Sequence, residues 1–453
     1  MPIRFFVIFG AFLISVLMWA DRACIAAAKD SIREDLRLDD GSMGWIMGAF
    51  SLGYALFQVP AGKLADRFGP RSVLSGVCLL WSLFTALTGI AGTFFSMLAV
   101  RFLFGAGEAG GYPTITRALT SWLPMNERGI ANSISFSGGR LGAALAMPTV
   151  VGLMQVLGGW RPTFIGFGLV GMVTAIVWWL AFRDTPETHP AVSDRERDYI
   201  LQHRDTKVTA AAGQDDAVQA EQPTPSPDAD AAAPHQAAAL PTAVMLRSTN
   251  LLLLMFQYVA HNFTVFFTVT WFFDYLKKTY ELTSMQTALY NAAPLLCGVL
   301  GNWIAGFTTD RLFESGRWRR SRRLPAMTGF VFAAVGMSLC VQMETPITAV
   351  ACMCLAIFGS DMVLSPSWST CMDIGRQDAG AVSGSMNMVG NLGALAASTS
   401  FPYLNQWWGS HDLFFYLAAA MNIAAILAWS RIRPDLPIHD ETGFTKTSME
   451  TNA

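Results

Sequence analysis

Twelve long apolar runs limit what this chain can fold into. An apolar run of ~17 residues or more can cross the hydrocarbon core of a bilayer as an α-helix. Helices are favoured there because each backbone polar group finds its hydrogen-bond partner within the segment. Six runs lie near residues 4–28, 43–63, 72–92, 95–117, 129–153 and 160–182, and six more near 250–275, 285–308, 325–344, 346–368, 380–404 and 411–431. The sequence therefore predicts an all-α membrane protein with twelve transmembrane helices in two six-helix bundles.

The composition agrees with this prediction and excludes several partners. Of the 453 residues, 52% are hydrophobic and only 14% are charged, whereas a soluble domain has about 25% charged residues. The net charge is −2 and the basic residues are spread over short loops, so we expect the lipid bilayer, and no nucleic acid, as a partner. The seven cysteines lack metal-ligand spacing and are expected to pack as small apolar residues. We expect a monomer that uses no cofactor, with protons as the coupling ion.

A polar segment divides the chain into two halves. It contains the stretch TKVTAAAGQDDAVQAEQPTPSPDADAAAPHQAAALP, which has almost no large apolar residues. Such a stretch cannot bury enough surface to offset the entropy of ordering it. We therefore predict an N-terminal bundle over 1–183, a largely disordered cytoplasmic linker over 184–247, a C-terminal bundle over 248–433 and a cytoplasmic tail over 434–453.

The orientation follows from the basic residues of the short loops. The loops after the second and eighth runs are the most basic, with Lys63, Arg67, Arg71, Arg311, Arg317, Arg319, Arg320, Arg322 and Arg323. On the opposite side, KDSIREDLRLDD has three basic residues against five acidic ones. Both termini are therefore predicted to be cytoplasmic. Trp19 and Trp45 lie near predicted span ends, where we expect aromatic anchors of the membrane interface.

The same two loops repeat one another. The first reads GKLADRFGPR, and the second begins GFTTDR at Gly306. In each, a Gly permits close approach of helices, and an Asp four residues later can lie against the positive N-terminal end of a neighbouring helix. The residues of the first copy are Gly62, Asp66, Arg67, Gly69 and Arg71. Two copies in matching positions indicate a duplicated transporter.

With these motifs the chain resembles the major facilitator superfamily over essentially its whole length, and more specifically its anion:cation symporter branch. The resemblance is carried by ADRACIAAA around Asp21, by GWIMGAFSLGYALFQVPAGKLADR and by RFLFGAGEAGGYPTITRALTSWLPMNERG. That branch includes bacterial proton symporters for galactonate, glucarate and hexuronates, and animal carriers for sialic acid and glutamate. The resemblance implies two bundles with one central site, rocking alternating access and a place in a bacterial inner membrane.

Two apolar runs of the first half carry charges of both signs, Asp21 and Arg22 on the first and Arg101 and Glu108 on the fourth. A charge at bilayer depth costs at least ~2.5 to 3.5 kcal/mol, so it persists when paired or when it lines a wet pathway. Because Arg does not titrate usefully, the carboxylates would carry protons. The resemblance assigns the same roles, with Asp21 and Glu108 as proton-coupling sites, Arg22 as a ligand for the substrate carboxylate and Arg101 as its switching partner. The structural alternative is a static ion pair that orients helices.

Other polar residues inside the runs are candidates for the substrate site. Tyr54 can pack its ring and donate its hydroxyl to a ligand, and the resemblance places a substrate-contacting tyrosine there. Gln58, one turn on, can equally join two helices. Arg140 stands in the fifth run where members of the branch usually carry an uncharged polar residue. It could bind a second carboxylate or neutralise Asp361 of the tenth run, and both readings stay open.

The second half offers weaker candidates. Trp271 and Tyr275 lie four residues apart on one helix face and could close over a ligand. Asn387 and Asn391 have the same spacing, and their amides could bond the hydroxyls of a polyhydroxy acid or join helices. His261 lies too near the cytoplasmic half to be a predicted ligand.

Three function classes compete. Buried arginines beside titratable acids favour a proton-coupled symporter that imports a small organic anion by alternating access. A sugar acid (an aldonate, hexuronate or aldarate) fits the Asn pair and the family, and an aromatic or other dicarboxylate such as phthalate or tartrate fits Arg140. A proton/drug antiporter would need an acidic cavity, which the buried arginines oppose. A sensor or an enzyme would need a signalling domain, a nucleotide loop or a metal motif, so we expect no enzymatic activity.

Overall fold

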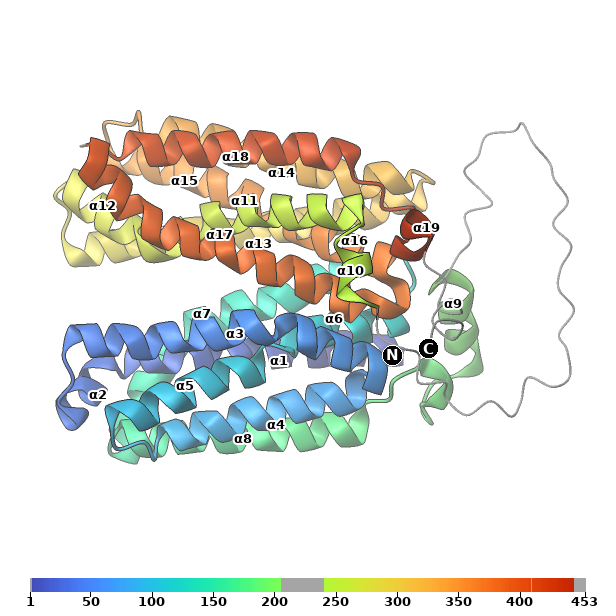
Figure 1. Cartoon of the computed structure of the whole chain (residues 1–453), viewed down its shortest axis with the longest axis horizontal. Helices are drawn as coiled ribbons and strands as arrows, with labels where there is room; N and C mark the ends of the chain where they lie inside the picture. Colours follow the sequence, from blue (N-terminus) through green and yellow to red (C-terminus); the bar gives the residue numbers. More distant parts are fainter. Residues whose placement is uncertain (1, 205–239, 409, 444–453) are drawn as a thin grey trace, which may run out of the picture.

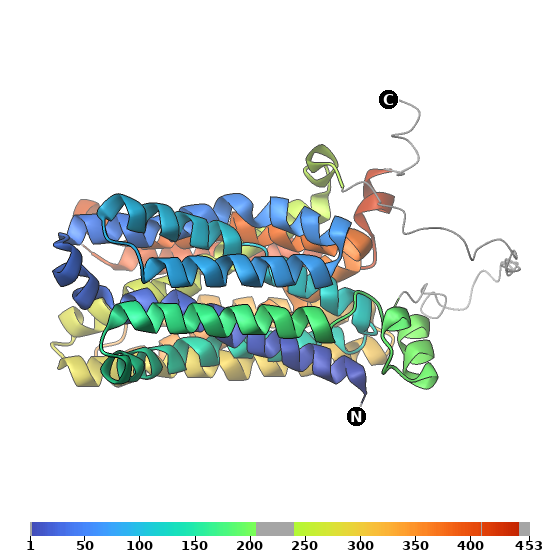
Figure 2. The same ribbon diagram turned by 90° about the horizontal axis from the view of Figure 1, so that it is seen from below.

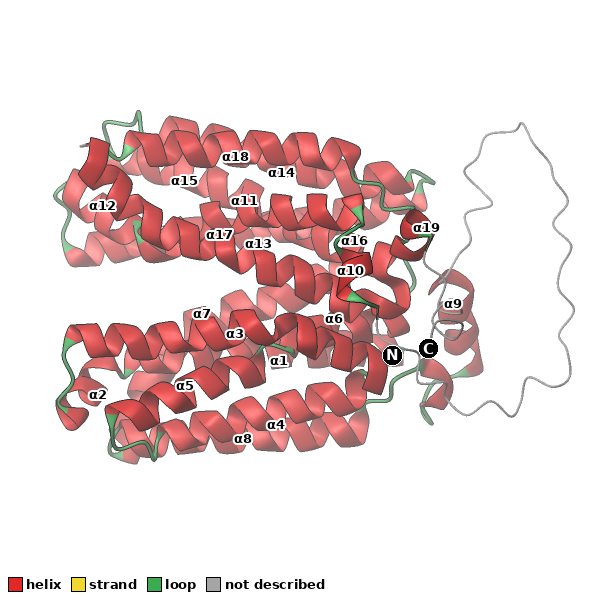
Figure 3. Ribbon diagram, viewed as in Figure 1, coloured by secondary structure: helices red, strands yellow, loops and turns green. Residues whose placement is uncertain are grey.

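The computed structural model describes residues 2–204, 240–408 and 410–443, and these residues are almost entirely helical, without a strand (Figure 3). The helices form two bundles that lie side by side, one built from the first half of the chain and one from the second (Figure 1). The first long helix begins and the last one ends at the same end of the molecule (Figures 1 and 2). We call this the termini end, and the opposite end the far end.

Each bundle contains six spans within the described residues, as the sequence predicts. The N bundle contains α1 (Ile3–Ala27), α3 (Asp40–Phe68), α4 (Pro70–Thr88), α5 (Phe94–Glu108) with α6 (Gly111–Trp122), α7 (Arg128–Leu157) and α8 (Trp160–Ala181). The C bundle contains α11 (Thr249–Thr270) with α12 (Phe272–Thr279), α13 (Ser284–Glu314), α14 (Trp318–Cys340), α15 (Pro346–Asp361) with α16 (Leu364–Gly375), α17 (Ala379–Trp408) and α18 (Asp412–Arg431). The short α2 (Lys29–Leu36) lies at the far end (Figure 1).

The two bundles repeat one packing pattern. In the N bundle α1 packs on α7, α3 on α5 and α4 on α8, and in the C bundle α11 packs on α17, α13 on α15 and α14 on α18. The bundles meet through α3 with α17 and through α7 with α13, which are again equivalent pairs. The duplication inferred from two loops is therefore present in the helix contacts.

Four of the helices that begin at the far end are capped by side chains, in matching pairs. Asp39 caps α3 and Thr283 caps α13, while Thr93 caps α5 and Thr345 caps α15. Each side-chain oxygen accepts a first-turn backbone N–H that has no partner within the helix, which contributes about 1 kcal/mol to stability. These caps fix where the equivalent spans start.

Two predicted spans are wrong in detail, because each is broken in its middle and runs further than predicted. The fourth run divides into α5 and α6, and the tenth divides into α15 and α16. Pro113 and Pro366 each stand at the third position of the second piece. A proline has no backbone N–H, and its ring clashes with the carbonyl four residues earlier, here that of Ala109 and of Met362. The prolines therefore explain why both spans break at equivalent places.

The predicted linker is partly helical. Its described residues include a 3-10 turn at Pro186–Thr188, α9 (Asp194–Arg204) and α10 (Thr242–Met245), whereas 205–239, which holds most of the Ala- and Pro-rich stretch, lies outside the described residues. Helix α9 is anchored because the Glu196 carboxylate accepts the backbone N–H groups at the start of α1, at 2.9 and 3.0 Å. The N bundle ends with α8 at Ala181, and residues 184–204 of the predicted linker contain helical structure, while the disorder predicted for most of the linker concerns residues outside those described.

The predicted tail contains an equivalent anchor. Helix α19 (Ile438–Thr442) carries Glu441, whose carboxylate accepts from the Ser248 hydroxyl at 2.6 Å and from the Asn250 backbone N–H at 3.2 Å. Glu441 therefore caps the start of α11 as Glu196 caps α1. The repeat of the two bundles extends beyond their membrane-length helices.

Eight helical stretches among the described residues are long and apolar enough to cross a membrane, and one of them, Pro346–Phe401, runs through α15, α16 and α17. Helices α3, α5, α6 and α7 are not among the eight. Helices α5 and α6 are too short on their own, at 15 and 12 residues, and this group of four contributes buried polar side chains, among them Gln58, Arg101 and Glu108. The central polar groups therefore come both from these helices and from α1, which is among the eight and carries Asp21 and Arg22.

Candidate functional site

A cavity lies between the two bundles, with an empty volume of about 650 Å³ that includes its mouth. It is lined from α1, α3, α6 and α7 on one side and from α11, α16 and α17 on the other. The predicted site residues that line it are Arg22, Tyr54, Arg140, Asn387 and Asn391.

Arg22 reaches this cavity from α1 and is paired from behind by Glu108. Its Nε donates to Glu108 Oε1 at 2.5 Å, and its guanidinium lies 4.3 Å from the centroid of the Tyr54 ring. The Arg22 side chain is 18% exposed, whereas that of Glu108 is fully buried. In the described part of the chain, Arg22 Nη2 and Glu108 Oε2 have no hydrogen-bond partner. Arg22 and Glu108 can therefore each form a further hydrogen bond.

Asp21 and Arg101 do not line the cavity but lie buried behind it. Neither Asp21 carboxylate oxygen has a hydrogen-bond partner in the described chain, although Asp21 is within electrostatic range of Glu108 and Arg101. Arg101 makes no ion pair within the described residues, and its guanidinium lies 4.4 Å from the centroid of the Phe104 ring. Burying charges without partners costs several kcal/mol, so fold stability does not explain these two residues.

The amides of α17 connect the two walls. Asn387 Nδ2 donates to the Tyr54 hydroxyl at 3.4 Å, across the bundles, and Asn391 Nδ2 donates to the Asn387 backbone oxygen at 2.8 Å. Gln58 is buried one turn from Tyr54, and its amide has no partner in the described chain. The structure thus brings Tyr54 and both asparagines together at one side of the cavity.

Arg140 is paired across the bundles with Asp361. Its Nη2 donates to both carboxylate oxygens, at 2.7 and 2.8 Å. The Arg140 side chain is 19% exposed and lines the cavity, whereas that of Asp361 is 1% exposed. Asp361 is therefore neutralised by Arg140, as one reading of the sequence predicted, and the other reading, contact with substrate, stays a prediction.

Trp271 and Tyr275 are not among the residues that line the cavity. The Trp271 indole donates to the Ser398 backbone oxygen at 2.8 Å, and Tyr275 packs among aromatic rings, including that of Phe415 at 5.2 Å between centroids. Their closing over a ligand stays a prediction, and the described contacts are those of packed side chains.

His261 and Asn262 line the cavity, although His261 was predicted to lie too near the cytoplasmic half to be a ligand. They share one face of α11 with Tyr258 and Val265, at spacings of three, four and seven residues. His261 Nδ1 lies 3.2 Å from the Ser360 hydroxyl. That periodicity was the available signal, but the predicted depth of the helix in the membrane was given more weight.

An aromatic wall was also missed. The Tyr112 ring lies 5.0 Å from that of Phe136, which lies 5.1 Å from that of Trp368, measured between centroids. The Trp19 indole donates to the Tyr112 hydroxyl at 2.9 Å and lines the cavity, so its prediction as an interface anchor was wrong. Aromatic faces suit the carbon skeleton of a small organic molecule.

Two equivalent aspartates join the two bundles on the termini side of the cavity. Asp66 accepts the backbone N–H groups of Gly380 and Ala381 at 2.9 and 2.7 Å, at the start of α17. Asp310 accepts those of Gly129 and Ile130 at 2.8 and 2.7 Å, at the start of α7. Each aspartate therefore joins one bundle to the other, with the geometry that the repeated loops predicted.

The other residues of the first loop shape this contact. Gly62 packs directly on the Gly380 backbone, where any side chain would collide. Gly69 has a φ of 80°, which favours glycine, and links α3 to α4. Arg67 lies over the Phe68 ring, and Arg71 Nε donates to the Trp179 backbone oxygen at 2.9 Å. Gly62 therefore lets the two bundles approach closely, whereas Gly69, Arg67 and Arg71 make their contacts within the N bundle.

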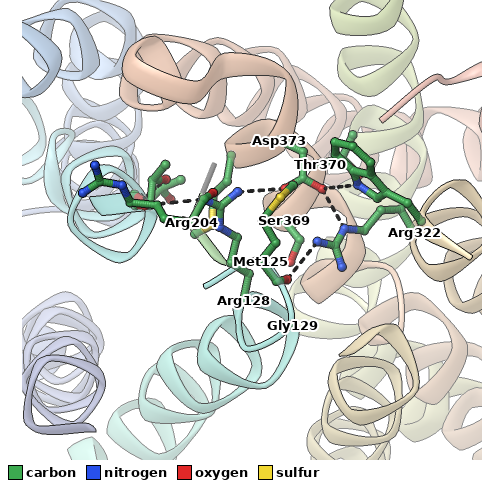
Figure 4. A network of polar contacts seen from close by, with 12 residues as sticks. Met125, Arg128, Gly129, Arg204, Arg322, Ser369, Thr370 and Asp373 are labelled. Carbon is green, nitrogen blue, oxygen red and sulfur yellow. Dashed lines mark hydrogen bonds and ion pairs between the residues drawn. The ribbon is translucent and has the colours of Figure 1, made fainter. Parts of the chain in front are cut away.

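A second polar network joins the bundles beside the aspartates (Figure 4). Asp373 accepts from Arg128 at 2.9 Å and from Arg322 at 2.8 Å, and its Oδ2 also accepts from the Trp318 indole at 3.1 Å. Arg322 also donates to the Met125 backbone oxygen at 3.3 Å. Arg322 was predicted to be a loop charge, but both it and Arg128 are buried. We call this network and the two aspartate caps the gate contacts.

Comparison with known proteins agrees with this architecture. The family model of the Major Facilitator Superfamily matches residues 11–398. The chain is 30% identical over 428 residues to the probable sulfoacetate transporter SauU of Cupriavidus necator, covering 94% of this chain and 93% of that one. It is 29% identical over 437 residues to the probable galactarate/D-glucarate transporter GudP of Bacillus subtilis, covering 94% and 91%.

A solved structure shares the fold. The proton:xylose symporter XylE, bound to 6-bromo-6-deoxy-D-glucose, superposes with a TM-score of 0.70 at 14% identity over 97% of this chain and 98% of that one. The match of the family model, the two repeated bundles and the central cavity lead to one assignment. The chain belongs to the major facilitator superfamily and is a multi-pass membrane transporter, not an enzyme.

Proposed function

We propose that this protein is a proton-coupled symporter that imports a sugar acid (an aldonate, hexuronate or aldarate) by alternating access. The observation that carries the proposal is the Arg22–Glu108 pair, a cation that faces the cavity with a buried carboxylate directly behind it. The relatives named for galactarate and glucarate support a sugar acid as the substrate class.

The pair supplies a route from anion binding to proton binding. Arg22 cannot titrate usefully, so it stays a fixed cation and draws an incoming carboxylate. When that carboxylate takes over the guanidinium, Glu108 loses its counter-charge and binds a proton, since a lone buried carboxylate is costly. Asp21, whose carboxylate oxygens accept no hydrogen bond within the described residues, provides a second proton site, and Arg101 is the cation that can engage whichever acid is ionised.

The contacts between bundles then determine which way the cavity opens. The gate contacts hold the termini end closed, and we propose that this end is cytoplasmic in a bacterial inner membrane. The Tyr54–Asn387 bond joins the bundles at the cavity itself. A substrate whose hydroxyls bond both side chains would draw the walls together and favour rocking of the bundles.

Dicarboxylates such as phthalate or tartrate are the second candidate class, favoured by Arg140 and the aromatic wall. Proton/drug antiport is a remoter alternative. Two cavity arginines with carboxylates enclosed behind them repel a cationic drug more than they attract it.

Transport in proteoliposomes tests the proposal. Purified protein would be reconstituted and supplied with radiolabelled galactarate and galactonate under an inward pH gradient, and separately under an inward sodium gradient. We expect accumulation with the pH gradient and its collapse when a protonophore is added. Accumulation that needs sodium and ignores the pH gradient would overturn the proton coupling.

A further inference from the structure

Two arginines face the cavity in the same way. Arg22 and Arg140 are 18% and 19% exposed in their side chains, and each is backed by an enclosed carboxylate, Glu108 or Asp361. The first pair lies within the N bundle, and the second joins α7 to α15 across the bundles. The proposed function uses the first pair as its anion and proton site and assigns no role to the second.

Arg140 keeps most of its donors for another partner. Both Asp361 oxygens accept from one nitrogen, Nη2. Within the described residues, Arg140 Nε and Nη1 have no hydrogen-bond partner. Neither atom is among the buried atoms that lack a partner, so both are accessible. A guanidinium presents five N–H groups in a planar fork that matches a carboxylate or a sulfonate through two parallel bonds. One edge of the Arg140 fork therefore faces the cavity.

Asp361 is placed to hold that edge in position. It is the last residue of α15, at the break that Pro366 imposes, and a side chain at Gly298 of α13 would collide with its carboxylate. The carboxylate is thus confined from behind. It binds one nitrogen of Arg140 and leaves the other two available to a ligand.

A structural ion pair in this molecule looks different. At the gate, the two Asp373 oxygens are shared among Arg128, Arg322 and the Trp318 indole, and the carboxylate is enclosed. There the acid uses several donors and is satisfied by them. Asp361, by contrast, accepts only from Nη2 of Arg140, and Arg140 itself still lines the cavity.

We propose that Arg140 is a second anion subsite of the cavity, and that the transported molecule is an organic dianion whose two acidic groups bind Arg22 and Arg140. This inference rests on the proposed function and narrows its substrate class to aldarates and short acids with a second carboxylate or sulfonate. An aldonate or hexuronate would engage one arginine only. The aromatic wall, with Tyr112 and Trp368, then contacts the carbon skeleton between the two charges.

Galactarate and galactonate form a matched pair of probes, since they share one carbon skeleton and differ by a carboxylate in place of a hydroxymethyl group. Calorimetry on the purified full-length protein should show galactarate binding about tenfold or more tighter than galactonate. Arg140→Gln should remove about tenfold or more of the galactarate affinity and leave galactonate within about threefold. Arg161→Gln, which breaks an Arg–Asp pair outside the cavity lining, is the control and should change neither ligand.

The double variant Arg140→Gln with Asp361→Asn covers the case in which the single variant misfolds. It removes both charges, so it should fold and bind galactonate but not regain the preference for galactarate. Wild-type preference in the double variant, or equal binding of the two acids by the wild type, would overturn the second subsite. If the wild-type protein binds none of galactarate, galactonate and sulfoacetate, the proposed function as an organic-anion symporter fails.

Discussion

The central cavity and the gate contacts hold similar charged residues in opposite states. At the gate, both oxygens of Asp66 and of Asp310 accept backbone N–H groups, and Asp373 is shared by two arginines. Around the cavity, both oxygens of Asp21 and one of Glu108 lack partners in the described chain. Charged groups whose hydrogen bonds are all made stabilise one arrangement of the bundles, whereas those without partners can still bind a ligand or a proton.

This difference predicts different effects of substitutions in the two regions. Substitutions at the cavity should abolish or alter transport while the fold survives, because they remove fewer satisfied contacts than substitutions at the gate. Substitutions at the gate should first reduce stability or shift the balance between conformations. Four predictions test this division, ordered from the largest expected effect.

The first prediction concerns the acids behind Arg22. Asp21→Asn and Glu108→Gln should each abolish accumulation driven by a pH gradient, because an amide cannot carry a proton. At least one of the two variants should still bind substrate, since Arg22 remains. Uptake in proteoliposomes and calorimetry on the same preparations measure the two properties.

The matched control for these acids is Asp35→Asn, which removes a carboxylate that pairs with Arg161 away from the cavity and should leave uptake unchanged. Accumulation at wild-type levels in both acid variants would show that neither carboxylate couples protons. Loss of folding in both would place them with the gate residues instead.

The second prediction concerns Asp373. Asp373→Asn leaves Arg128 and Arg322 facing a neutral amide in a buried site, which should destabilise the protein by about 3 to 5 kcal/mol. We expect a lower unfolding temperature in detergent and a smaller folded yield. Asp435→Asn removes the partner of the half-exposed Arg319 and should cost less than about 1 kcal/mol. Equal effects of the two variants would contradict the view that burial decides the outcome.

Much of the fold was readable from the sequence, because bilayer thickness and backbone hydrogen bonding leave few options. The twelve runs appear as spans, and the repeated Gly and Asp positions predicted the caps made by Asp66 and Asp310. The broken spans were missed because Pro113 and Pro366 lie inside apolar runs, where hydropathy outweighed the missing N–H. Helix α9 was missed because one acidic cap, Glu196, anchors it.

The candidate site was readable only in part. Arg22, Tyr54 and the two asparagines stand out as polar residues within apolar runs, and the cavity contains them. Which charges pair with each other is set by tertiary packing, so the bonding of Arg140 by a single nitrogen had no sequence signal. Trp19 was misplaced because a tryptophan near a span end can face the lipid interface or the protein interior with equal hydropathy.

The third prediction concerns Arg22. Arg22→Lys keeps the charge but replaces a planar fork with a single ammonium, so substrate binding should weaken by roughly 1.5 to 3 kcal/mol. Arg161→Lys, outside the cavity lining, should leave affinity unchanged. Calorimetry measures both, and unchanged affinity in a folded Arg22→Lys protein would remove Arg22 from the site.

The last and smallest prediction tests the symmetry of the gate. Asp66→Ala and Asp310→Ala each remove two bonds to the start of a helix in the other bundle, which should cost about 1 kcal/mol apiece. Asp66 also has Arg117 at 3.6 Å, so its replacement should cost slightly more. Unfolding temperatures measure stability, and distances between spin labels at the termini ends of the two bundles measure opening.

The gate comparison predicts a specific outcome for the double variant. In each single variant, one cap remains and still holds the bundles together. If the two caps restrain the same opening motion, the double variant Asp66→Ala with Asp310→Ala should therefore widen the spin-label distances by more than the sum of the two single effects. Strict additivity in stability with unchanged distances would mean that the caps only stabilise their own helices. The closing of the cavity at the termini end would then depend on the Asp373 network alone.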